Sequence, residues 1–581
     1  MKITELSLTN FRSFKETQKI EFAPVTLLFG PNSVGKSSVL LALFYLQQIL
    51  EKGQCDPVRI EALGDKHIGG FKNLVNGRDL GKEMVIKVSF STADDIGATY
   101  NDIEDIVSDD SLELYALNSD SPAAEANSVS LEFRLGWSDS EKTAFVSRYT
   151  VWLDEELVAE ATSDPGLKQP MISYINYEHP LVVDENGEDD FASHFHRLIT
   201  EPRMANEAFE VYDVDSVASR DKAFYHVPIG FRGRAGALPL LGRRLSTSLN
   251  LNSEIDNWRV EEILSDVLVA PLDNLLEFLA ESLCIGPLRI VPDDMYQADP
   301  YPQQKDWYTG KAAWDAMRST DYLMNKKINH WLSDKDTLNM GYKLVYEVEQ
   351  GESRYISLPT GALEADDFVA LSDMVDVGKL EITFSTEDLD VNPEAEETPV
   401  STDAFMSAMS VISSASETTS GLYLDKADFK RKHIALWDIG NNLAVSASEI
   451  GVGVSQLMPL VVAANTRQKG LVACEQPELH VHPRVQVAIG DLLTQIENGP
   501  SFLIETHSEH LILRILRRIR ETGDGDLPDE IKAVSPADIS IVHMDSSENG
   551  VRVHRIGIDE DGEFSKKWPD GFFAERSKEL F

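Results

Sequence analysis

The chain has little cysteine for its length and no long apolar run. Its three cysteines, Cys55, Cys284 and Cys474, lie far apart in 581 residues and match no disulfide or zinc spacing. No apolar stretch approaches the ~20 residues that cross a membrane. The first residues also lack the apolar core of a signal peptide. We therefore expect a cytoplasmic protein without a membrane partner.

Basic residues are also scarce. The chain carries 53 Lys and Arg against 97 Asp and Glu, which gives a net charge of −44. Such a charge excludes broad nonspecific attraction to nucleic acid or to anionic lipid, although a local basic surface remains open. Two interpretations fit the excess of acid: general solubility, including in a salty habitat, and an acidic face for a basic protein partner.

The acidic residues are unevenly spread. Residues 88–133 contain eleven Asp or Glu and residues 380–425 contain ten, and neither stretch contains Lys or Arg. Both stretches look like insertions, and the Ser- and Thr-rich second one is expected to include a mobile loop. Sustained heptads are lacking, so a long coiled coil is not expected.

Hydrophobic periodicity predicts an α/β chain. After residue 430, apolar strands alternate with helical segments, which is typical of a largely parallel sheet covered by helices on both faces. The N-terminal part adds to this pattern. The sequence there predicts strands at 3–8 and 25–29, a helix from 37 to about 52, and helical residues at 254–283 interrupted by Pro271.

A phosphate-binding loop stands between the second of these strands and the helix. Residues 30–38, "GPNSVGKSS", match G-x-x-x-x-G-K-[ST] in the strand–loop–helix context that the motif requires. Backbone amides of such a loop face phosphate oxygens, Lys36 would reach the β and γ phosphates, and Ser37 would ligate Mg²⁺. The candidate ATP-binding residues of this loop are Asn32, Ser33, Gly35, Lys36, Ser37 and Ser38.

A second apolar strand ends in an acid at residues 471–483, "LVACEQPELHVHP". A phosphate loop needs an acid on a neighbouring strand for its magnesium, so Glu475 is predicted as a magnesium partner together with Ser37. The histidines nearby, His480, His482, His507 and His510, leave a transition-metal site as a weaker alternative.

These motifs resemble ABC-type ATPases of the branch that contains SMC, RecF and the overcoming-lysogenization-defect nucleases. "LTNFRSF" at 8–14 resembles the N-terminal strand and turn of that branch, where Arg12 would lie near the phosphates. "EIGVGVSQLMPL" at 449–460 resembles the signature, and "FLIETHSEHL" at 502–511 the final strand with switch residue His507. The resemblance is strongest to stand-alone bacterial AAA-type ATPases of anti-phage defence systems, such as the ATPase of Septu, which end in a module like residues 568–581.

The resemblance implies a fold and a division of the chain. The expected fold class is α/β, an ABC-type, RecF- and SMC-like P-loop ATPase head with a mixed sheet and a large acidic α+β insertion. The expected parts are the first half of the head (1–90), an acidic insertion (91–250), a helical subdomain (251–345), a strand-containing segment with an acidic mobile loop (346–430), and the second half of the head with the C-terminal module (431–581).

The resemblance also implies a head-to-tail homodimer that encloses two ATP molecules. The signature of one subunit would cover the ATP of the other, and further assembly of such dimers stays open. The predicted signature contacts are Gly451, Gly453, Ser455 and Gln456. Relatives in defence systems act beside a nuclease or toxin, so an effector protein encoded nearby is the expected partner.

Three departures from the family pattern bear on activity. Gly451 replaces the usual signature serine, so Ser455 or Gln456 would take over its phosphate contact. No clear glutamine loop follows the first helix, where Lys72 and Asn73 are weak candidates. Gln476 fills the position of the catalytic glutamate, and an amide can orient water but cannot accept its proton as a carboxylate can. The hypothesis is slow hydrolysis by Glu475 and Gln476, with Glu478 or His507 supplying polarity.

Two other functions are open. A RecF-like ATPase of DNA repair or recombination would bind DNA directly, through the arginines of 230–246 or 514–520, but the net charge disfavours it. For 514–520, pairing with acids on a helix face is the preferred interpretation. A self-contained nuclease would need a metal-binding domain after residue 510, where only 71 residues remain. Arg289, in "GPLR", has no assigned role.

Overall fold

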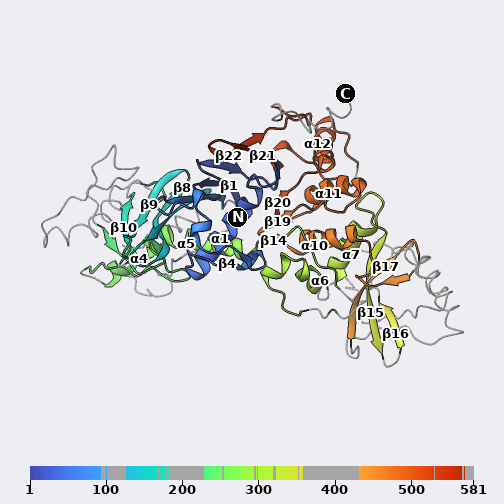
Figure 1. Ribbon diagram of the computed structural model, residues 1–581, viewed down its shortest axis with the longest axis horizontal. Coiled ribbons are helices and arrows are strands. Elements are labelled where there is room, and N and C mark those ends of the chain that lie inside the picture. Colours follow the sequence, from blue (N-terminus) through green and yellow to red (C-terminus); the bar gives the residue numbers. More distant parts are fainter. Residues whose placement is uncertain are drawn as a thin grey trace, which may run out of the picture.

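The structure is a computed structural model in which two sheets lie side by side with helices between and around them (Figure 1). It describes all residues except 93–99, 101–125, 168, 177–178, 182–227, 252–253, 293–295, 297–298, 318–321, 351–352, 358–430, 442, 529, 566–567 and 569–581. The expected acidic loop within 380–425 and nearly all of the C-terminal module therefore lie outside the described residues.

The central sheet has six strands in the order β14-β19-β20-β3-β21-β22. The first five strands run parallel, and β22 turns back antiparallel to β21. This arrangement confirms the mixed sheet of a P-loop ATPase head. The strands are β14 (Leu283–Ile285), β19 (Leu471–Glu475), β20 (Ser501–Glu505), β3 (Val25–Phe29), β21 (Ile539–Ser547) and β22 (Gly550–Ile556).

Apolar residues on both faces explain why this sheet is central. All five residues of β3 and all five of β19 are buried, as expected for strands covered on both sides. Along β3, Val25, Leu27 and Phe29 join one hydrophobic core, whereas Leu28 joins the other. The sheet thus separates two cores.

A second, antiparallel sheet has the order β11-β10-β9-β8-β7-β6-β1-β2. Its strands β6 and β7 pair over their full facing lengths, so one sheet runs across the domain boundary expected near residue 90. Its strands are β1 (Lys2–Thr9), β2 (Gln18–Glu21), β6 (Met84–Ser91), β7 (Ser128–Ser138), β8 (Thr143–Leu153), β9 (Glu156–Thr162), β10 (Met171–Ile175) and β11 (Ile229–Gly230).

Helices cover the central sheet on both sides. α1 (Lys36–Lys52) is buried along most of its length and belongs to the core that it shares with the antiparallel sheet and α5 (Ala270–Glu281). The other face is covered by α10 (Val452–Thr466), α11 (Pro483–Gln495) and α12 (Glu509–Asp524). As Pro271 predicts, the helical stretch after 254 is divided, with α4 (Glu254–Leu268) ending just before α5.

The expected helical subdomain also supplies a strand to the head. Its residues 283–285 form β14, which pairs in parallel with β19 at the sheet edge. Three residues are too short a run for periodicity to identify as a strand. The remaining helices of this part are α6 (Lys311–Met317) and α7 (Tyr322–Ser333).

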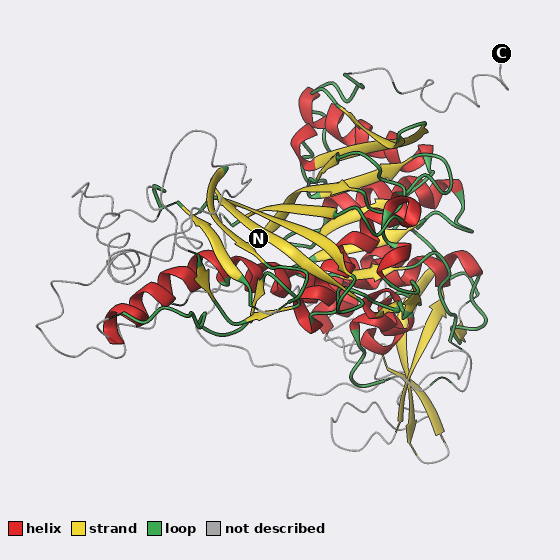
Figure 2. Cartoon of the chain, turned by 60° about the vertical axis from the view of Figure 1, so that its left-hand side comes forward, coloured by secondary structure: helices red, strands yellow, loops and turns green. Residues whose placement is uncertain are grey.

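A small four-stranded sheet projects from the molecule, at the lower right of Figures 1 and 2. It joins β15 (Tyr342–Gln350) and β16 (Ser353–Ser357) to β17 (Arg431–Asp438) and β18 (Leu443–Val445). Two-stranded pairs are formed by β4 (Arg59–Ile60) with β5 (Lys66–His67) and by β12 (Gly233–Arg234) with β13 (Leu238–Pro239). None of the helices described is long and apolar enough to span a membrane.

Candidate nucleotide site

The loop between β3 and α1 has the backbone of a phosphate cradle. Gly30 and Gly35 have φ values of 141° and 124°, and Ser33 lies at 65°. A Cβ on Gly30 would stand 2.2 Å from the carbonyl oxygen of Met544, so only glycine fits there. The loop then enters α1 at Lys36, and the free amides of this helix start favour an anion.

Lys36 is held at the centre of this loop. The residue is only 3% exposed, and its ammonium donates to the carbonyl oxygens of Gly30 (2.8 Å) and Pro31 (2.9 Å). The ammonium also lies 3.7 Å from Glu505. Burial lowers the pKa of Lys36, while the charges of Glu505 and Glu478 oppose this shift. The cation is thus placed inside the loop, where phosphates would bind.

Two carboxylates converge on the next residue, Ser37. Its hydroxyl lies 2.8 Å from Glu505 Oε2 and 3.2 Å from Glu475 Oε2, and it can donate its one proton to either. The two acids end neighbouring strands in direct register. Glu505 was not predicted from the sequence, although "FLIE" ends an apolar strand in an acid just as "LVACE" does.

The electrostatics of this acidic pair suit a bound cation. Burial raises the pKa of Glu475, the charge of Glu505 raises it further, and Lys66 and the bond from Ser37 oppose the shift. The phenol of Tyr308 also donates to Glu475 Oε1 at 3.2 Å. Two carboxylates and a hydroxyl at one point form the oxygen-rich set that Mg²⁺ prefers, so these residues fit the ion.

Gln476 follows Glu475 in a strained turn. Its φ is 48°, and its backbone N–H donates to the carbonyl oxygen of Glu505 at 2.7 Å. The side-chain amide makes no hydrogen bond to any other described residue, and it is half-buried. The amide is therefore available to orient a water molecule at the end of the two acidic strands.

Glu478 and His507 meet in the adjoining turn. Glu478 accepts a hydrogen bond from the backbone N–H of His507 (2.6 Å) and another from the hydroxyl of Thr506 (2.9 Å). Burial raises the pKa of Glu478. His507 is exposed on one side, but its partial burial and the nearby charge of Lys36 lower its pKa. Glu478 thus fixes the end of β20, and His507 lies within reach of the charge of Lys36.

The glycine-rich segment at the start of α10 has an exposed and a buried half. Gly451 is exposed, and a Cβ on it would meet nothing within 4 Å. Gly453 packs against the loop after β19, where its Cβ would lie 2.7 Å from the carbonyl oxygen of His480. The side chains of Ser455 and Gln456 turn into the subunit, and Ser455 donates to the carbonyl of Val452. Their predicted phosphate contact stays a prediction.

Arg289 joins this segment to the acidic strand end. It is 5% exposed, and its guanidinium donates to the carbonyl oxygens of Gln456 (2.7 Å), Glu475 (2.7 Å) and Gly286 (2.9 Å). The Gln456 amide returns bonds to the backbone of Arg289. A movement of α10 would therefore displace the backbone of Glu475 through the guanidinium of Arg289.

Two protein-family models match the chain. Residues 1–220 match a family described as an AAA ATPase domain, and residues 318–514 match one described as an AAA domain, putative AbiEii toxin, Type IV TA system. The two matches include the phosphate loop and the acidic strand β19, which come together in the structure. The chain thus carries two segments that match AAA ATPase domain models, and the fold joins them in one P-loop site.

Curated relatives match this ATPase over short stretches. The chain is 37% identical over 78 residues to the DNA replication and repair protein RecF of Roseiflexus castenholzii, and 42% identical over 45 residues to RecF of Desulforamulus reducens. These stretches cover 13% and 8% of this chain, and only 20% and 12% of those relatives. The chain thus matches only a small part of these relatives, and their activity is a matter for proposal.

Solved structures of SMC heads match this chain with low TM-scores. An SMC head bound to the C-terminal winged-helix domain of ScpA has a TM-score of 0.35 and 9% identity, over 96% of this chain and 99% of that one. The SMC head of Thermotoga maritima has a TM-score of 0.33 and 8% identity, over 96% and 100%. The fold assignment rests on the strand order of the ATPase head, to which these scores add nothing.

The remaining predicted residues of the ATP site differ in exposure. Asn32 and Ser33 are exposed on the loop, whereas Ser38 is buried in α1. Arg12 is exposed beside Ser13, whose hydroxyl would lie 2.4 Å from a Cβ on Gly35. The turn that holds Arg12 and Ser13 thus packs on the phosphate loop, and the partial burial of Arg12 there lowers its pKa.

The histidines do not form a metal site within the described part of the chain. No group of three or more His, Cys, Asp or Glu suitable for a metal ion is found there. His482 instead caps α11, because its Nδ1 accepts the backbone N–H of Arg484 at 3.2 Å. His480 is exposed with a φ of 61°. These residues therefore shape the loop after β19.

Three of the four arginines of 514–520 pair with acids, as preferred from the sequence, and Arg520 donates to the carbonyl oxygen of Asp561. Arg514 and Arg518 both contact Asp491, and Arg517 contacts Glu521. Lys72 and Asn73 lie exposed, and Asn73 bonds the carbonyls of its own loop. Lys66, on the same segment, is the residue whose charge acts on Glu475.

Proposed function

We propose that the chain is a Mg²⁺-dependent ATP-binding switch that hydrolyses ATP slowly and dimerises head to tail around ATP. The observation that carries this proposal is the convergence of Lys36, Ser37, Glu475 and Glu505 at one end of the central sheet, with Gln476 beside them. In this scheme Mg²⁺, held by Ser37 and the acids, neutralises phosphate charge.

The chain's own residues would share the remaining work. The amides of residues 30–38 bind the phosphates, and Lys36 leaves its carbonyl partners for the β and γ oxygens. Gln476 orients the attacking water, but a neutral amide takes no proton from it. Because phosphoryl transfer depends mainly on placement and charge, the reaction proceeds, although without a strong base. ATP would then hold the dimer long enough to signal.

We further propose that the dimer regulates an effector protein, such as a nuclease encoded nearby, in defence against phage. The description of the second matched family, which names a toxin system, supports this role. The net charge of −44 suits a basic protein partner better than nucleic acid. Residence in the cytoplasm belongs to the same proposal.

The test is particle sizing of the full chain with ATP and Mg²⁺, compared with the Lys36→Ala variant. We expect a dimer for the natural chain and a monomer for the variant, because the variant loses its phosphate contact. A natural chain that remains monomeric in ATP would overturn the proposal. Co-purification with the product of a neighbouring gene tests the effector separately.

A RecF-like function in DNA repair is the second candidate. It is favoured by the matched stretches of RecF proteins, which are 37% and 42% identical. Filter binding at low salt separates the two functions. Tight binding of duplex DNA by the isolated ATPase, without any partner, would favour the repair function.

A further inference from the structure

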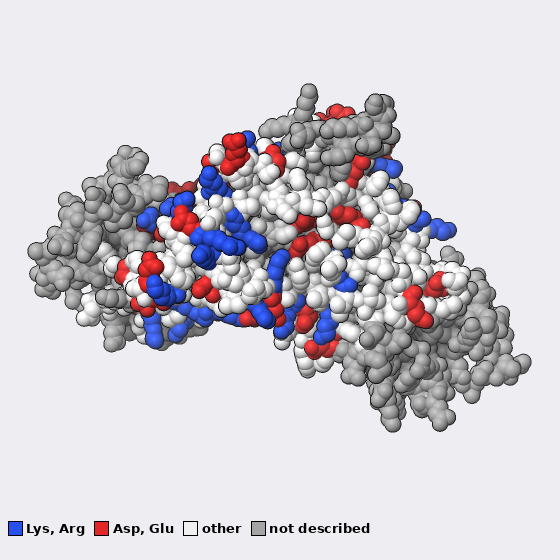
Figure 3. Space-filling view, viewed as in Figure 1, with Lys and Arg blue, Asp and Glu red and all other residues white. Residues whose placement is uncertain are grey.

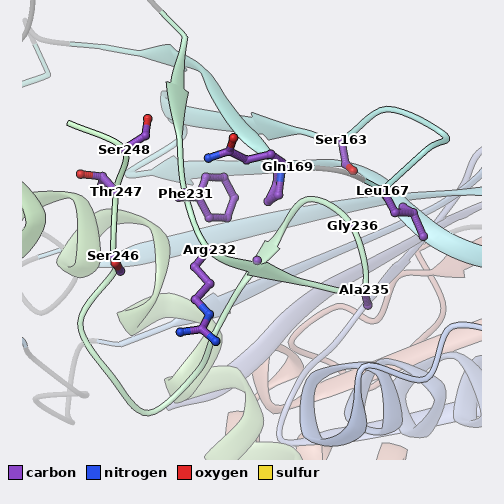
Figure 4. A pocket seen from close by; sticks show the side chains of 12 residues that line it. Ser163, Leu167, Gln169, Phe231, Arg232, Ala235, Gly236, Ser246, Thr247 and Ser248 are labelled. Atoms are coloured by element: carbon purple, nitrogen blue, oxygen red, sulfur yellow. The ribbon is translucent and has the colours of Figure 1, made fainter. Parts of the chain in front are cut away.

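A pocket of about 470 Å³ lies at the edge of the antiparallel sheet, apart from every residue of the nucleotide site. Figure 4 shows it between the connection from β9 to β10 and the arginine-rich segment 230–246. Its polar side chains are those of Ser163, Gln169, Arg232, Ser246, Thr247 and Ser248. Its volume is in the range of small-molecule sites, which is ~300–1,000 Å³.

Glycines bring the two walls of this pocket together. Gly236 has a φ of 100°, and a Cβ there would stand 2.3 Å from the carbonyl oxygen of Val146. A Cβ on Gly233 would stand 2.4 Å from the ring of Pro170. The two arms of the segment are then tied by hydrogen bonds from Arg232 N–H to the Ser246 carbonyl and from Ser248 N–H to the Gly230 carbonyl. The pocket is therefore a built feature of the fold.

The side chains of the lining favour an anion. The guanidinium of Arg232 is exposed and makes no hydrogen bond or ion pair with any residue that the structure describes. Ser246 and Ser248 are exposed and can present hydroxyls, and Gln169 presents an amide, whereas the hydroxyl of Thr247 already donates to Glu261. None of the lining residues is Asp or Glu. An arginine beside neutral donors, without a carboxylate, suits phosphate.

The segment that lines the pocket is basic, unlike the chain as a whole. The net charge is −44, yet residues 230–246 contain four arginines and no Asp or Glu. Other Lys and Arg residues gather over the part of the molecule that contains β1 and β8 (Figure 3). The adjacent Arg234 donates to the carbonyl of Glu51, near the C-terminal end of α1. Because α1 begins at Lys36, one helix of about 25 Å joins the pocket segment to the phosphate loop.

We propose that this pocket binds a phosphate ester of nucleotide size, with Arg232 as its anchor. The guanidinium would hold two phosphate oxygens. Figure 4 shows Ser248 and Gln169 on the other side of Phe231 from this guanidinium, so they would contact the rest of the ester and not the phosphate. A free nucleotide and a backbone phosphate of single-stranded nucleic acid present the same group, so both sources are compatible with this chemistry. The site does not depend on the proposed ATP switch.

The test measures binding of 5′-AMP and of a short single-stranded DNA by titration calorimetry. The full chain carries the Lys36→Ala substitution, which disables the phosphate loop. We expect binding of one probe or both, weakened at least tenfold by Arg232→Gln. Arg517→Gln is the control, because Arg517 is also an exposed arginine but is paired with Glu521.

The outcomes separate the source of the phosphate from the existence of the site. Binding of AMP indicates a free nucleotide, and binding of DNA alone indicates a nucleic-acid backbone. If neither probe binds, or if Arg232→Gln binds as well as the control variant, the pocket is not a phosphate site. An unchanged unfolding temperature of Arg232→Gln shows that a loss of binding is local.

Discussion

At the residue scale, Gln476 decides how fast the ATPase can be. Gln476→Glu places a carboxylate where the amide now stands, and this carboxylate can take the proton of the attacking water. We expect single-turnover hydrolysis to accelerate by about tenfold or more, since general-base catalysis contributes ~10²–10⁴. Gln476→Ala, which cannot orient water, should be slower than the natural chain. The idea fails if Gln476→Glu is no faster and the natural chain already turns over at tens per second.

Glu475 is needed for the proposed hydrolysis, but its charge lowers the stability of the fold. Its pKa is raised by burial and by Glu505, so its ionised form destabilises the fold. The stability linked to a raised carboxyl pKa is present at low pH and is lost as pH rises through the folded-state value. Glu475→Gln should therefore abolish hydrolysis yet raise the unfolding temperature at neutral pH by about 1–3 °C without nucleotide.

The increase in unfolding temperature caused by Glu475→Gln should shrink as pH falls toward the ordinary pKa of the carboxyl. Glu475 is then protonated, so it is as neutral as the glutamine of the variant. Thermal unfolding at several pH values measures this. Glu61→Gln is a suitable control, since Glu61 forms an exposed pair with Lys52 and its loss should change little. A lower unfolding temperature for Glu475→Gln at neutral pH would contradict the argument.

At the element scale, Arg289 connects α10, β14 and β19. Arg289→Met removes a charged donor from the carbonyls of Gln456 and Glu475, at a cost of about 1.5–3 kcal/mol each. We expect a lower urea midpoint, and a fall in kcat that exceeds any change in KM because Glu475 loses its support. Arg289→Lys, which keeps the charge, should recover part of the midpoint.

Arg467→Met is the matched control for Arg289. Arg467 also lies at an end of α10, but its side chain is 31% exposed and rests over the ring of Trp307. Its loss should lower the midpoint only slightly. Equal effects of the two substitutions would show that Arg289 acts as an ordinary packing residue and does not support Glu475.

Local pattern predicted the elements of the site well. A helix from residue 37 was expected, and α1 begins at Lys36, because the loop glycines and the apolar run that follows leave few alternatives. Glu505 and the bonds of Arg289 were not found, since they depend on which strands become neighbours. That pairing is set by tertiary packing across more than a hundred residues, as for β14 with β19, and no local period encodes it.

The antiparallel sheet shows the same limit. Residues 91–250 were expected to be an acidic insertion, with no fold assigned. Where the structure describes this range, β7 to β11 extend the sheet that begins with β1 and β6. Charge reports the surface of a segment, whereas strand pairing depends on its buried side, where Val129, Leu131 and Phe133 join the same core as α1.

At the scale of the whole molecule, the proposed dimer has an exposed point at which it can be tested. Gly451 has a φ of −59°, and no atom lies within 4 Å of a Cβ placed on it, so a larger side chain fits the isolated subunit. In a head-to-tail dimer, Gly451 would face the phosphates of the second subunit's ATP. Gly451→Glu would then set a carboxylate against phosphate charge without disturbing the fold.

We expect Gly451→Glu to bind ATP with natural affinity but to remain monomeric in ATP and Mg²⁺, as measured by light scattering after size exclusion. Tyr301→Glu adds the same charge at a side chain that is 84% exposed, and it should dimerise normally. Since Lys36→Ala prevents dimers by losing ATP, only Gly451→Glu separates binding from assembly. A Gly451→Glu chain that still dimerises would place the interface elsewhere and remove the signature segment from the proposed switch.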